Sequence, residues 1–328
     1  MARIERIAFA ELTGWGADDH GAALPVFLRS CSHARSTGQI AAADLTGLQG
    51  AAEAARSADA RRFFEQAFVP LRIRDGDVSL FTGYYEPELL GSRQSGGIYR
   101  HPIYAPPPDL PEGRPWLSRA EIAAGALSGR GLEIVWLRDP VEAFFMHVQG
   151  SARIRLEEGG TARLGFAGRN GHPYRSVGRH MVARGLLAPH EASAQAIKTW
   201  VRENGAEGEA VLNHNPSYIF FEERPELEPG LGPVGALGIS VTAMRSLAVD
   251  PDYVPLGAPV WVETEGPEGP ISHLMIAQDV GSAIKGAQRG DIFFGSGDAA
   301  GALAGRMRAN GSLTTLVPRQ AAARLGFA

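Results

Sequence analysis

The sequence predicts a mainly β fold that opens with helices, and a change of pattern along the chain supports this prediction. Between residues 17 and 33, Ala23, Phe27 and Cys31 recur at the spacing of one helix face, and an alanine-rich segment over 45–68 is also predicted to be helical. After these helices the apolar runs become short and are separated by glycine and proline. Short strands with turn residues between them are typical of β-barrels and sandwiches, so we expect the rest of the chain to be rich in strands.

The middle of the chain contains one hairpin that the sequence predicts directly. The stretch RIRLEEGGTARLGF has alternating residues on both sides of 158–160, where two glycines can supply the positive φ of a tight turn. We expect residues 142–149 before this hairpin to be extended as well. Phe144, Phe145 and Tyr218 are then interpreted as strand aromatics that fill a core rather than as binding residues.

Three further helices are predicted between and after the strands. The first covers 190–203, where apolar residues share one face, and the second is a short helix over 241–247. The third follows the last glycine-rich segment, and either Ser296 or Asp298 is expected to cap its N-terminus. The fold class is therefore a β protein with helices at its start and between its strands.

The composition excludes several classes of function. A net charge of −4 and the absence of any Lys/Arg run give no electrostatic surface for nucleic acid. The single cysteine, Cys31, excludes an internal disulfide and a thiolate metal site, and we expect it to pack as a small apolar residue. The nine histidines form no zinc motif. We predict no metal and no cofactor.

The N-terminal segment shows no export signal as written. It lacks a basic region followed by an unbroken apolar run, and no stretch reaches the roughly 18 apolar residues of a membrane helix. Cys31 is a poor lipid-attachment site, because Arg29, Asp18 and Asp19 interrupt the apolar region that such a signal requires.

The stretch HLMIAQDVGSAIKGAQRGDIFFGSGDAAG contains the strongest candidates for chemistry. Asp279 and Asp291 each lie at the end of a predicted strand, next to glycine and to large apolar residues. Burial of this kind disfavours the ionised carboxylate and can make it a general acid or base. Asp298 is interpreted as a helix cap and Asp250, before proline, as a turn residue, since aspartate beside glycine or proline is a common turn signal.

Several longer motifs extend this interpretation. VGALGISVTAMRSLAVD, DPDYVPLGAPVWVE and AQDVGSAIKGAQRGDIFFGSG resemble the C-terminal three-aspartate domain of the membrane-bound lytic murein transglycosylase A family, whose carboxylates match Asp250, Asp279 and Asp291. FTGYYEPELLGSR, YRHPIYAPPPDL, FFMHVQGSARIRL and NPSYIFFEE resemble upstream motifs of the same family. Ordered motifs of this length are far more specific than any single tripeptide.

The resemblance implies a fold of two domains. Residues 1–88 and 225–328 would form a discontinuous double-psi β-barrel that carries the catalytic aspartates, and residues 89–224 a smaller inserted β-barrel, with a groove between the two.

The resemblance also implies an activity. Members of the family cleave the β-1,4 bond between N-acetylmuramic acid and N-acetylglucosamine in peptidoglycan without water, which leaves a 1,6-anhydro ring on the muramic acid. A hydrolytic glycosidase needs two carboxylates, but here the sugar's own 6-hydroxyl attacks, so one carboxyl group can act as acid and then as base. We assign this role to Asp291. Asp279 is expected to support it as a nearby anion, and Asp250 to shape the barrel.

Further residues are predicted to bind the glycan, because sugars are recognised by aromatic faces together with amide and hydroxyl groups. Lys285 is expected either to hold a carboxylate of peptidoglycan or to be a solvated loop residue. The predicted substrate-binding residues are Thr82, Gly83, Tyr84, Tyr85, Glu86, Gln149, Gly150, Ser151, Ala236, Gly238 and Lys285.

Three alternatives remain at this point. Asp-Val-Gly-Ser at 279–282 resembles the turn of aspartic proteases, but a bilobal protease would show two such turns. A wall-binding barrel without activity and a hydrolase that uses water are the others. Since family members are exported, often as outer-membrane lipoproteins, we expect a periplasmic monomer, either free or associated with the outer membrane, that binds glycan strands. Either its true start lies upstream or its delivery differs.

Overall fold

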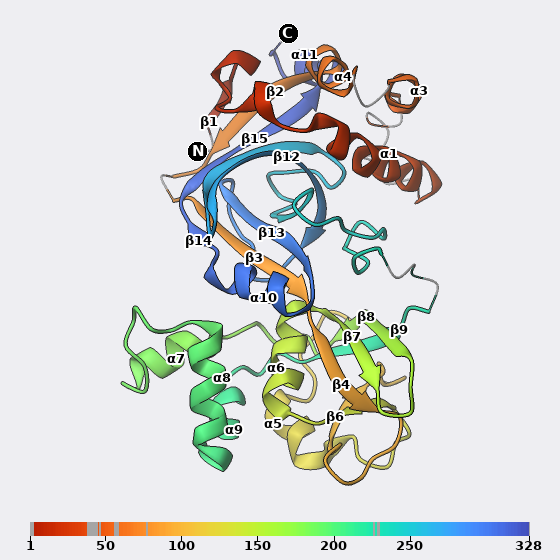
Figure 1. The fold of residues 1–328 in the computed structure, drawn as a ribbon, viewed down its shortest axis with the longest axis vertical. Coiled ribbons are helices and arrows are strands. Elements are labelled where there is room, and N and C mark those ends of the chain that lie inside the picture. Colours follow the sequence, from red (N-terminus) through yellow and green to blue (C-terminus); the bar gives the residue numbers. More distant parts are fainter. Residues whose placement is uncertain are drawn as a thin grey trace. The chain divides into compact units, whose positions relative to one another are not determined.

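The computed structural model describes residues 3–37, 45, 47–55, 59–76, 78–225, 227 and 230–327. The chain divides into two compact units (Figure 1). The barrel unit consists of Met1–Tyr85, Gly230–Gly295 and Ala302–Ala328, and the insert unit consists of Glu86–Pro229 and Ser296–Gly301. The first is thus built from both ends of the chain, whereas most of the second is a single insertion.

Nine strands form one sheet in the order β1-β2-β15-β11-β12-β10-β13-β3-β14. Their bounds are β1 Arg3–Arg6, β2 Phe68–Arg74, β3 Leu80–Glu86, β10 Ser246–Val249, β11 Pro259–Gly266, β12 Gly269–Val280, β13 Arg289–Ser296, β14 Arg308–Ala309 and β15 Gly311–Pro318. β14, at one end of this order, also contacts β11 in the middle, so the sheet curls upon itself. Most neighbours are antiparallel, but β10 runs parallel to β12.

The concave side of this sheet holds the barrel core. Leu247 and Val249 of β10 pack there against Ile292 of β13 and Phe81 of β3. Since side chains alternate along a strand, Ala248 and Asp291 point to the opposite, outer side. The alternation therefore separates the apolar filling of the barrel from the candidate carboxylates.

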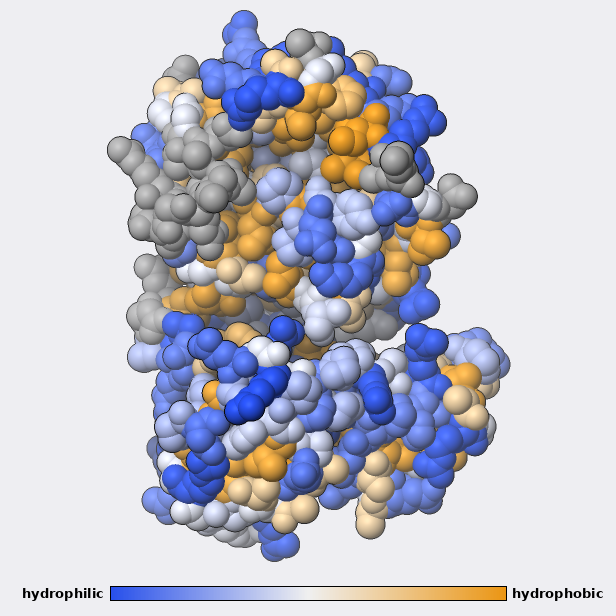
Figure 2. Space-filling model, turned by 180° about the vertical axis from the view of Figure 1, so that it is seen from behind, coloured by the Kyte–Doolittle hydropathy of each residue, from blue (hydrophilic) through white to orange (hydrophobic). Residues whose placement is uncertain are grey.

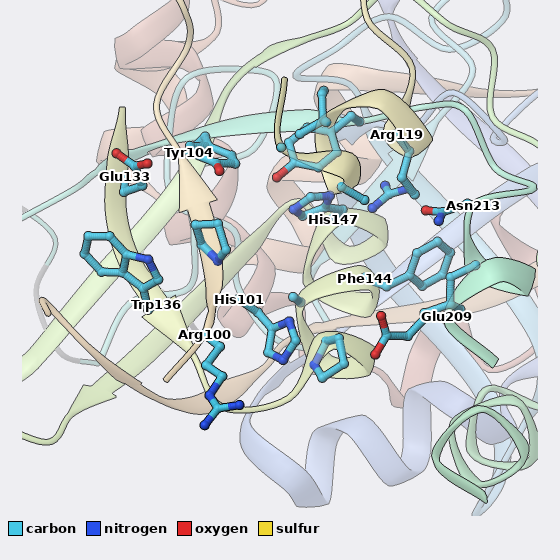
Figure 3. A pocket seen from close by; sticks show the side chains of 18 of the residues that line it. Arg100, His101, Tyr104, Arg119, Glu133, Trp136, Phe144, His147, Glu209 and Asn213 are labelled. Carbon is cyan, nitrogen blue, oxygen red and sulfur yellow. The ribbon is translucent and has the colours of Figure 1, made fainter. Parts of the chain in front are cut away.

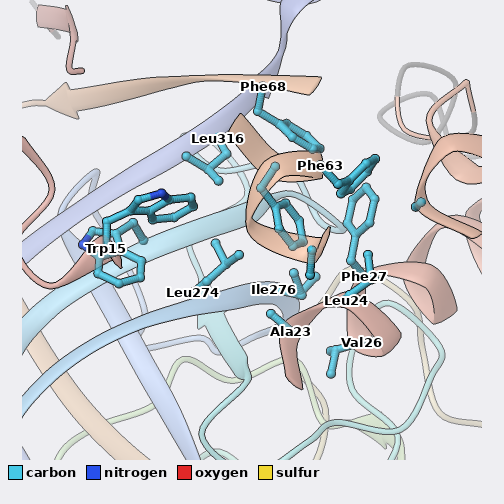
Figure 4. Close-up of a cluster of buried hydrophobic side chains, with 14 of the residues drawn as sticks. Trp15, Ala23, Leu24, Val26, Phe27, Phe63, Phe68, Leu274, Ile276 and Leu316 are labelled. Carbon is cyan, nitrogen blue, oxygen red and sulfur yellow. The ribbon is translucent and has the colours of Figure 1, made fainter. Parts of the chain in front are cut away.

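Helices cover another part of the outer side. α1 (His20–Thr37) and α4 (Ala60–Ala67) pack Phe27 and Phe64 against Trp261, Leu274 and Ile276 of β11 and β12, as Figure 4 shows for most of this cluster. Other helices in the described part of this unit are the short 3-10 helices η1 Phe9–Glu11 and η2 Trp15–Ala17, with α3 Gln49–Ala54 and α11 Arg319–Arg324. Helix α10 Gly297–Arg306 begins in the insert unit.

A buried ion cluster ties the start of α1 to β12. Asp18 accepts hydrogen bonds from Arg245 at 2.8 and 2.9 Å, from His273 at 2.9 Å and from the backbone N–H of Leu274 at 2.9 Å. Its side chain is only 1% exposed. Because four donors surround one carboxylate, this contact fixes the position of the helical layer on the sheet.

The insert unit contains a six-stranded sheet in the order β5-β6-β4-β7-β8-β9. The strands are β4 Glu88–Ser92, β5 His101–Tyr104, β6 Glu133–Leu137, β7 Ser151–Leu156, β8 Thr161–Arg169 and β9 Ile219–Glu223. The helices are α5 Arg119–Glu121, the π-helical turn η4 Ile122–Ala126, α6 Pro140–Gln149, α7 Val177–Ala183, α8 Ala194–Glu203 and α9 Gly205–Leu212. One core lies between α6 and the sheet, around Ile154 and Phe221, and a second joins α6 to α7, α8 and α9.

The mainly β prediction is confirmed, and so are several of its elements. The predicted hairpin is β7 and β8, with positive φ at Gly159 and Gly160, and α8 lies within the predicted helix 190–203. The helix predicted after the last glycine-rich segment is α10, which begins directly after Ser296. Cys31 is buried in an apolar cluster, as expected.

Two segments differ from the prediction. Residues 142–149 belong to helix α6, because Asp139 caps its N-terminus through the N–H of Val141 and Pro140 occupies its first turn. Phe144 and Tyr218 do fill cores, but the first does so from a helix. The helix expected at 241–247 is instead a turn followed by β10, since two neighbouring strands pair with this segment and override its local preference.

The surface that Figure 2 displays carries several hydrophobic patches among hydrophilic residues. Large side chains that are exposed include Val78, Ile98, Phe166 and Leu325. Among the helices that the structure describes, none has the length and apolar character needed to cross a bilayer.

Candidate active site

Strand β10 brings Asp279 and Asp291 to one place on the outer side of the barrel. Ala248 of β10 pairs with Asp279 of β12 on one side and with Asp291 of β13 on the other. Neighbouring strands lie about 4.8 Å apart, so the two backbones are separated by roughly 10 Å across a single alanine. The small side chain of Ala248 leaves room for both carboxylates to approach each other.

An irregularity in β10 decides which residue of β12 lies opposite Ala248. Leu247 pairs with Ala277, and regular pairing would then place Gln278 next to Ala248. The register shifts between Leu247 and Ala248, so that Asp279 takes this position. Gln278 instead remains buried, where it bonds with Ser246 and Ser30. A one-residue shift exchanges the two faces of a strand, and bulges commonly serve to re-aim a side chain in this way.

Asp291 is held by a short chain of hydrogen bonds. Thr82 of β3 donates its hydroxyl proton to Oδ1 of Asp291, and the Nη2 group of Arg289 donates to the Thr82 oxygen at 2.7 Å. A guanidinium can only donate, so the single hydroxyl proton of Thr82 must point to Asp291. Burial raises the pKa of Asp291, while the Thr82 hydrogen bond and the charge of Arg289 partly offset this increase.

Asp279 is also buried, but backbone groups hold it. Its Oδ1 accepts the N–H of Ala236 and of Val280, both at 2.9 Å. Burial raises the pKa of Asp279 to about 6, against the opposing effect of these two hydrogen bonds, and the negative charge of Asp291 adds to the increase. The close approach of the 235–236 backbone requires Gly235, because a Cβ there would lie 2.6 Å from the carbonyl oxygen of Gln278.

Tyr84 is the third polar group of this cluster. The residue is 9% exposed, and its ring packs on that of Phe293 with 5.1 Å between the ring centroids. Its hydroxyl has no hydrogen-bond partner of normal geometry within the described part of the chain, yet it lies close enough to interact with Asp279. Burial and the charges of Asp279 and Asp291 raise the pKa of Tyr84 well above its usual value. The neutral hydroxyl is thus a buried donor beside both carboxylates.

Asp250, the third matching aspartate, makes different contacts. It follows β10 and accepts hydrogen bonds from the backbone N–H of Gly286 at 2.8 Å and from the ammonium group of Lys285 at 3.0 Å. These bonds outweigh burial and lower the pKa of Asp250. The carboxylate therefore fixes the 250–257 and 281–288 loops to each other, and Lys285, whose side chain is 60% exposed, is one of its partners.

The other predicted substrate-binding residues are distributed over both units. Gly83 is required for packing, since a Cβ there would lie 2.6 Å from the ring of Phe294, and Gly238 has a positive φ beside His33. In the insert unit, Gly150 ends α6 in the left-handed conformation between Gln149 and the buried Ser151 at the start of β7. Tyr85 is partly buried in β3.

Glu86 is the centre of an ion-pair cluster within the insert unit. Its carboxylate, 1% exposed, accepts hydrogen bonds from Arg153 at 2.6 Å, from Arg163 at 2.9 Å and from the hydroxyl of Ser296 at 2.7 Å. These contacts join β3, β7, β8 and the residue before α10. The sequence identified Glu86 as polar and suited to a site, but its partners are more than 60 residues away and could not be foreseen.

Sequence reasoning missed Arg289 and Ala248. The role of Arg289 depends on its hydrogen bond to Thr82 of another strand, and Ala248 is an ordinary apolar residue that only the strand pairing identifies. No group of three or more potential metal ligands is present within the described ranges.

The chain is similar to known proteins in both units. Residues 80–222 match the family model of the MltA specific insert domain, and residues 245–317 match that of the 3D domain. A curated relative is the membrane-bound lytic murein transglycosylase A of Vibrio cholerae, which is 33% identical over 246 residues, or 72% of this chain and 64% of that protein. The enzyme of the same name from Escherichia coli K12 is 37% identical over 238 residues, or 69% of this chain and 62% of that protein. The matched region is thus less than two thirds of the length of these relatives.

Solved structures match over nearly the whole chain. A membrane-bound lytic murein transglycosylase from Agrobacterium tumefaciens is 36% identical, with a TM-score of 0.88 that covers 98% of this chain and 99% of that one. MltA from Neisseria gonorrhoeae is 34% identical, with a TM-score of 0.82 and coverage of 97% and 93%. Escherichia coli MltA with bound chitohexaose is 29% identical, with a TM-score of 0.73 and coverage of 90% of each chain.

Proposed function

Because the chain belongs to the membrane-bound lytic murein transglycosylase A family, we propose that it cleaves the β-1,4 bond between N-acetylmuramic acid and N-acetylglucosamine of peptidoglycan and forms 1,6-anhydro-N-acetylmuramic acid. The observation that supports this proposal best is the pair of buried carboxyl groups, Asp279 and Asp291, on either side of Ala248. The pKa of each is raised by burial, as acid catalysis near neutral pH requires.

Asp291 is assigned as the acid and then the base. In its protonated form it gives a proton to the glycosidic oxygen as the bond from this oxygen to C1 of the muramic acid breaks. The 6-hydroxyl of the same sugar then attacks C1 and returns its proton to Asp291, so no water is consumed and the enzyme is restored. Thr82 already donates to Oδ1 of Asp291, so the catalytic proton is carried on Oδ2.

Asp279 is proposed to stabilise the positive charge that develops on the sugar ring. With a pKa of about 6, it is ionised in about nine of ten molecules at pH 7. The N–H groups of Ala236 and Val280 hold its Oδ1, so it needs no reorganisation when the charge appears. Asp250 is proposed to be structural, because Lys285 and Gly286 already engage its carboxylate.

The finer structural and cellular assignments are also proposals. The parallel β10–β12 pair within an otherwise mostly antiparallel, curled sheet supports a double-psi β-barrel formed by residues 1–88 and 225–328 around an inserted domain of 89–224. The names of the curated relatives support association with a membrane. We propose a periplasmic monomer at the outer membrane that acts on glycan strands, with Thr82, Tyr84, Tyr85 and Gln149 among the residues that contact them.

The test is to digest purified peptidoglycan with the wild-type protein and with Asp291→Asn, and to weigh the products by mass spectrometry. Anhydro-muropeptides from the wild type and none from Asp291→Asn are expected. Products with ordinary reducing ends would show that the protein is a hydrolase. If the wild type gives no product, the remaining alternative is a wall-binding module without activity. Full activity of Asp291→Asn together with loss in Asp279→Asn would exchange the roles of the two carboxyl groups.

A further inference from the structure

A second candidate site lies in the insert unit, and Asp250, Asp279 and Asp291 are not part of it. It is a cavity of about 420 Å³ formed by β5, β6, α5, the η4 turn, α6 and α9 (Figure 3). This volume lies within the usual range for a small-molecule pocket. All of its lining residues belong to one compact unit.

The cavity contains a buried cation, Arg119, that has no counter-ion among the described residues. Arg119 is 6% exposed and donates from Nε to the carbonyl oxygen of Asn215 at 3.2 Å and from Nη2 to that of Ser217 at 2.6 Å. The rings of Phe144 and Tyr218 lie 4.8 and 5.1 Å from its guanidinium carbon. Within the part of the chain that the structure describes, no carboxylate forms an ion pair with Arg119, and its Nη1 group has no acceptor.

A buried cation of this kind is costly for the fold unless something compensates it. The aromatic rings and two carbonyl groups provide part of the compensation, but burial still lowers the pKa of Arg119 to about 10. Breaking or omitting the partner of a buried charge usually destabilises a protein by several kcal/mol. A guanidinium kept in this state is typical of a site that receives an anionic ligand, for which arginine offers paired donors.

His147 adds a second unused polar group on the same side of the cavity. It is 8% exposed, and neither ring nitrogen has a hydrogen-bond partner among the described residues. Burial and the positive charge of Arg119 lower its pKa well below the usual value, so the ring is neutral and offers one donor and one acceptor. Figure 3 shows the side chains of Arg119 and His147 close together.

Other lining residues supply the opposite charge and an apolar wall. Glu133 and Glu209 also face the cavity, and neither forms an ion pair within the described ranges. Tyr104 and Trp136 contribute aromatic surface. The cavity thus combines a buried cation, carboxylates and aromatic rings, which is complementary to a molecule that carries a carboxylate, an ammonium group and short apolar side chains.

We propose that this cavity binds a zwitterionic peptide, with its carboxylate on Arg119 and His147 and its ammonium group near Glu133 or Glu209. This choice of ligand rests on the proposed function, which points to the stem peptide of peptidoglycan. The stem peptide bears free carboxylates and has an amino group at its diamino acid. The insert unit would then recognise the peptide while the aspartates act on the glycan.

Calorimetric titration of the full chain with the free tetrapeptide L-Ala-γ-D-Glu-meso-diaminopimelyl-D-Ala tests the proposal. The wild type should bind it, and amidation of the terminal carboxylate should weaken binding at least tenfold. Arg119→Met should weaken binding at least tenfold as well, whereas Arg119→Lys, which keeps the charge, should retain part of the affinity. Ser128→Trp, at the exposed mouth of the cavity, should block binding without touching the buried cation.

Several outcomes would overturn the proposal. One is that the wild type does not bind the peptide; another is that binding survives in both Arg119→Met and Ser128→Trp while circular dichroism shows folded proteins. Acetate or inorganic phosphate binding as tightly as the peptide would mean a small-anion site instead. The cleavage assay separates the two proposals. Cleavage of peptidoglycan without peptide binding refutes only the proposal that the cavity binds a peptide. Peptide binding by the wild type and by Asp291→Asn, without cleavage by either, refutes only the proposed activity.

Discussion

Replacing Thr82 by valine tests the hydrogen-bond chain that controls Asp291. Valine has nearly the same shape but lacks the hydroxyl that donates to Oδ1 of Asp291. A hydrogen bond to a charged group contributes about 1.5–3 kcal/mol. One pH unit corresponds to about 1.36 kcal/mol. Since this bond stabilises only the ionised form fully, its loss should raise the pKa of Asp291 by about 1–2 units.

The sign of the effect on catalysis follows from the role of Asp291 as an acid. The protonated form is active, so kcat/KM falls as the pH rises through the pKa of Asp291, and Thr82→Val should move this basic limb upward by about 1–2 pH units. The assay is the rate of anhydro-muropeptide release between pH 4 and 9. Thr82→Ser should leave the limb in place, as should Thr314→Val, which removes a buried hydroxyl bonded to Arg72 in the same sheet. An unmoved or lowered limb in Thr82→Val would refute the assignment.

Three other substitutions probe the buried charges. Asp18→Asn should lower the free energy of unfolding by about 3–5 kcal/mol at pH 7, because it leaves Arg245 buried without its partner. The four hydrogen bonds of Asp18 outweigh burial and lower its pKa, so the stability that its carboxylate provides should disappear as the pH falls below about 4. If urea titrations show the same difference between wild type and variant at low pH as at pH 7, this reasoning is wrong. Glu86→Gln should destabilise the protein by a similar amount in a thermal melt, because it leaves Arg153 and Arg163 without their buried partner. An unchanged Tm together with a raised KM would instead indicate that Glu86 contacts the substrate directly. Lys285→Met removes a mostly exposed partner of Asp250 and should change the free energy of unfolding by less than about 1 kcal/mol in a urea titration. A loss of activity at unchanged stability would indicate that Lys285 contacts the substrate.

The sequence predicted the two central carboxyl groups but not how they meet. Asp279 and Asp291 could be found because each follows or begins an apolar run next to glycine, a pattern that local rules and the family motifs both identify. Their common neighbour, Ala248, directly follows a segment predicted to be a helix, and the strand there forms only because β12 and β13 pair with it on both sides. Such long-range pairing leaves no signal in a window of a few residues.

The same limit explains the residues whose role was harder to foresee. The Phe144 segment was predicted as a strand because an apolar run without clear periodicity is ambiguous, although the Asp139-Pro140 cap was visible as a helix start. Glu86 and Arg119 are polar residues whose meaning depends on the presence or absence of distant partners. The first is fully paired with Arg153 and Arg163, and the second has no carboxylate partner among the described residues.

The register shift beside Ala248 connects the fold to the chemistry. Without it, Gln278 would lie beside Ala248 and Asp279 would face the apolar interior of the barrel, where an ionised carboxylate has no solvation. With it, Asp279 reaches the N–H groups of Ala236 and Val280 and shares a site with Asp291. The irregularity interrupts the regular pairing of β10 with β12. It places two carboxyl groups where burial raises both pKa values, and backbone donors limit the increase at Asp279. Chemistry at this site therefore depends on a single extra residue in β12 as much as on the aspartates themselves.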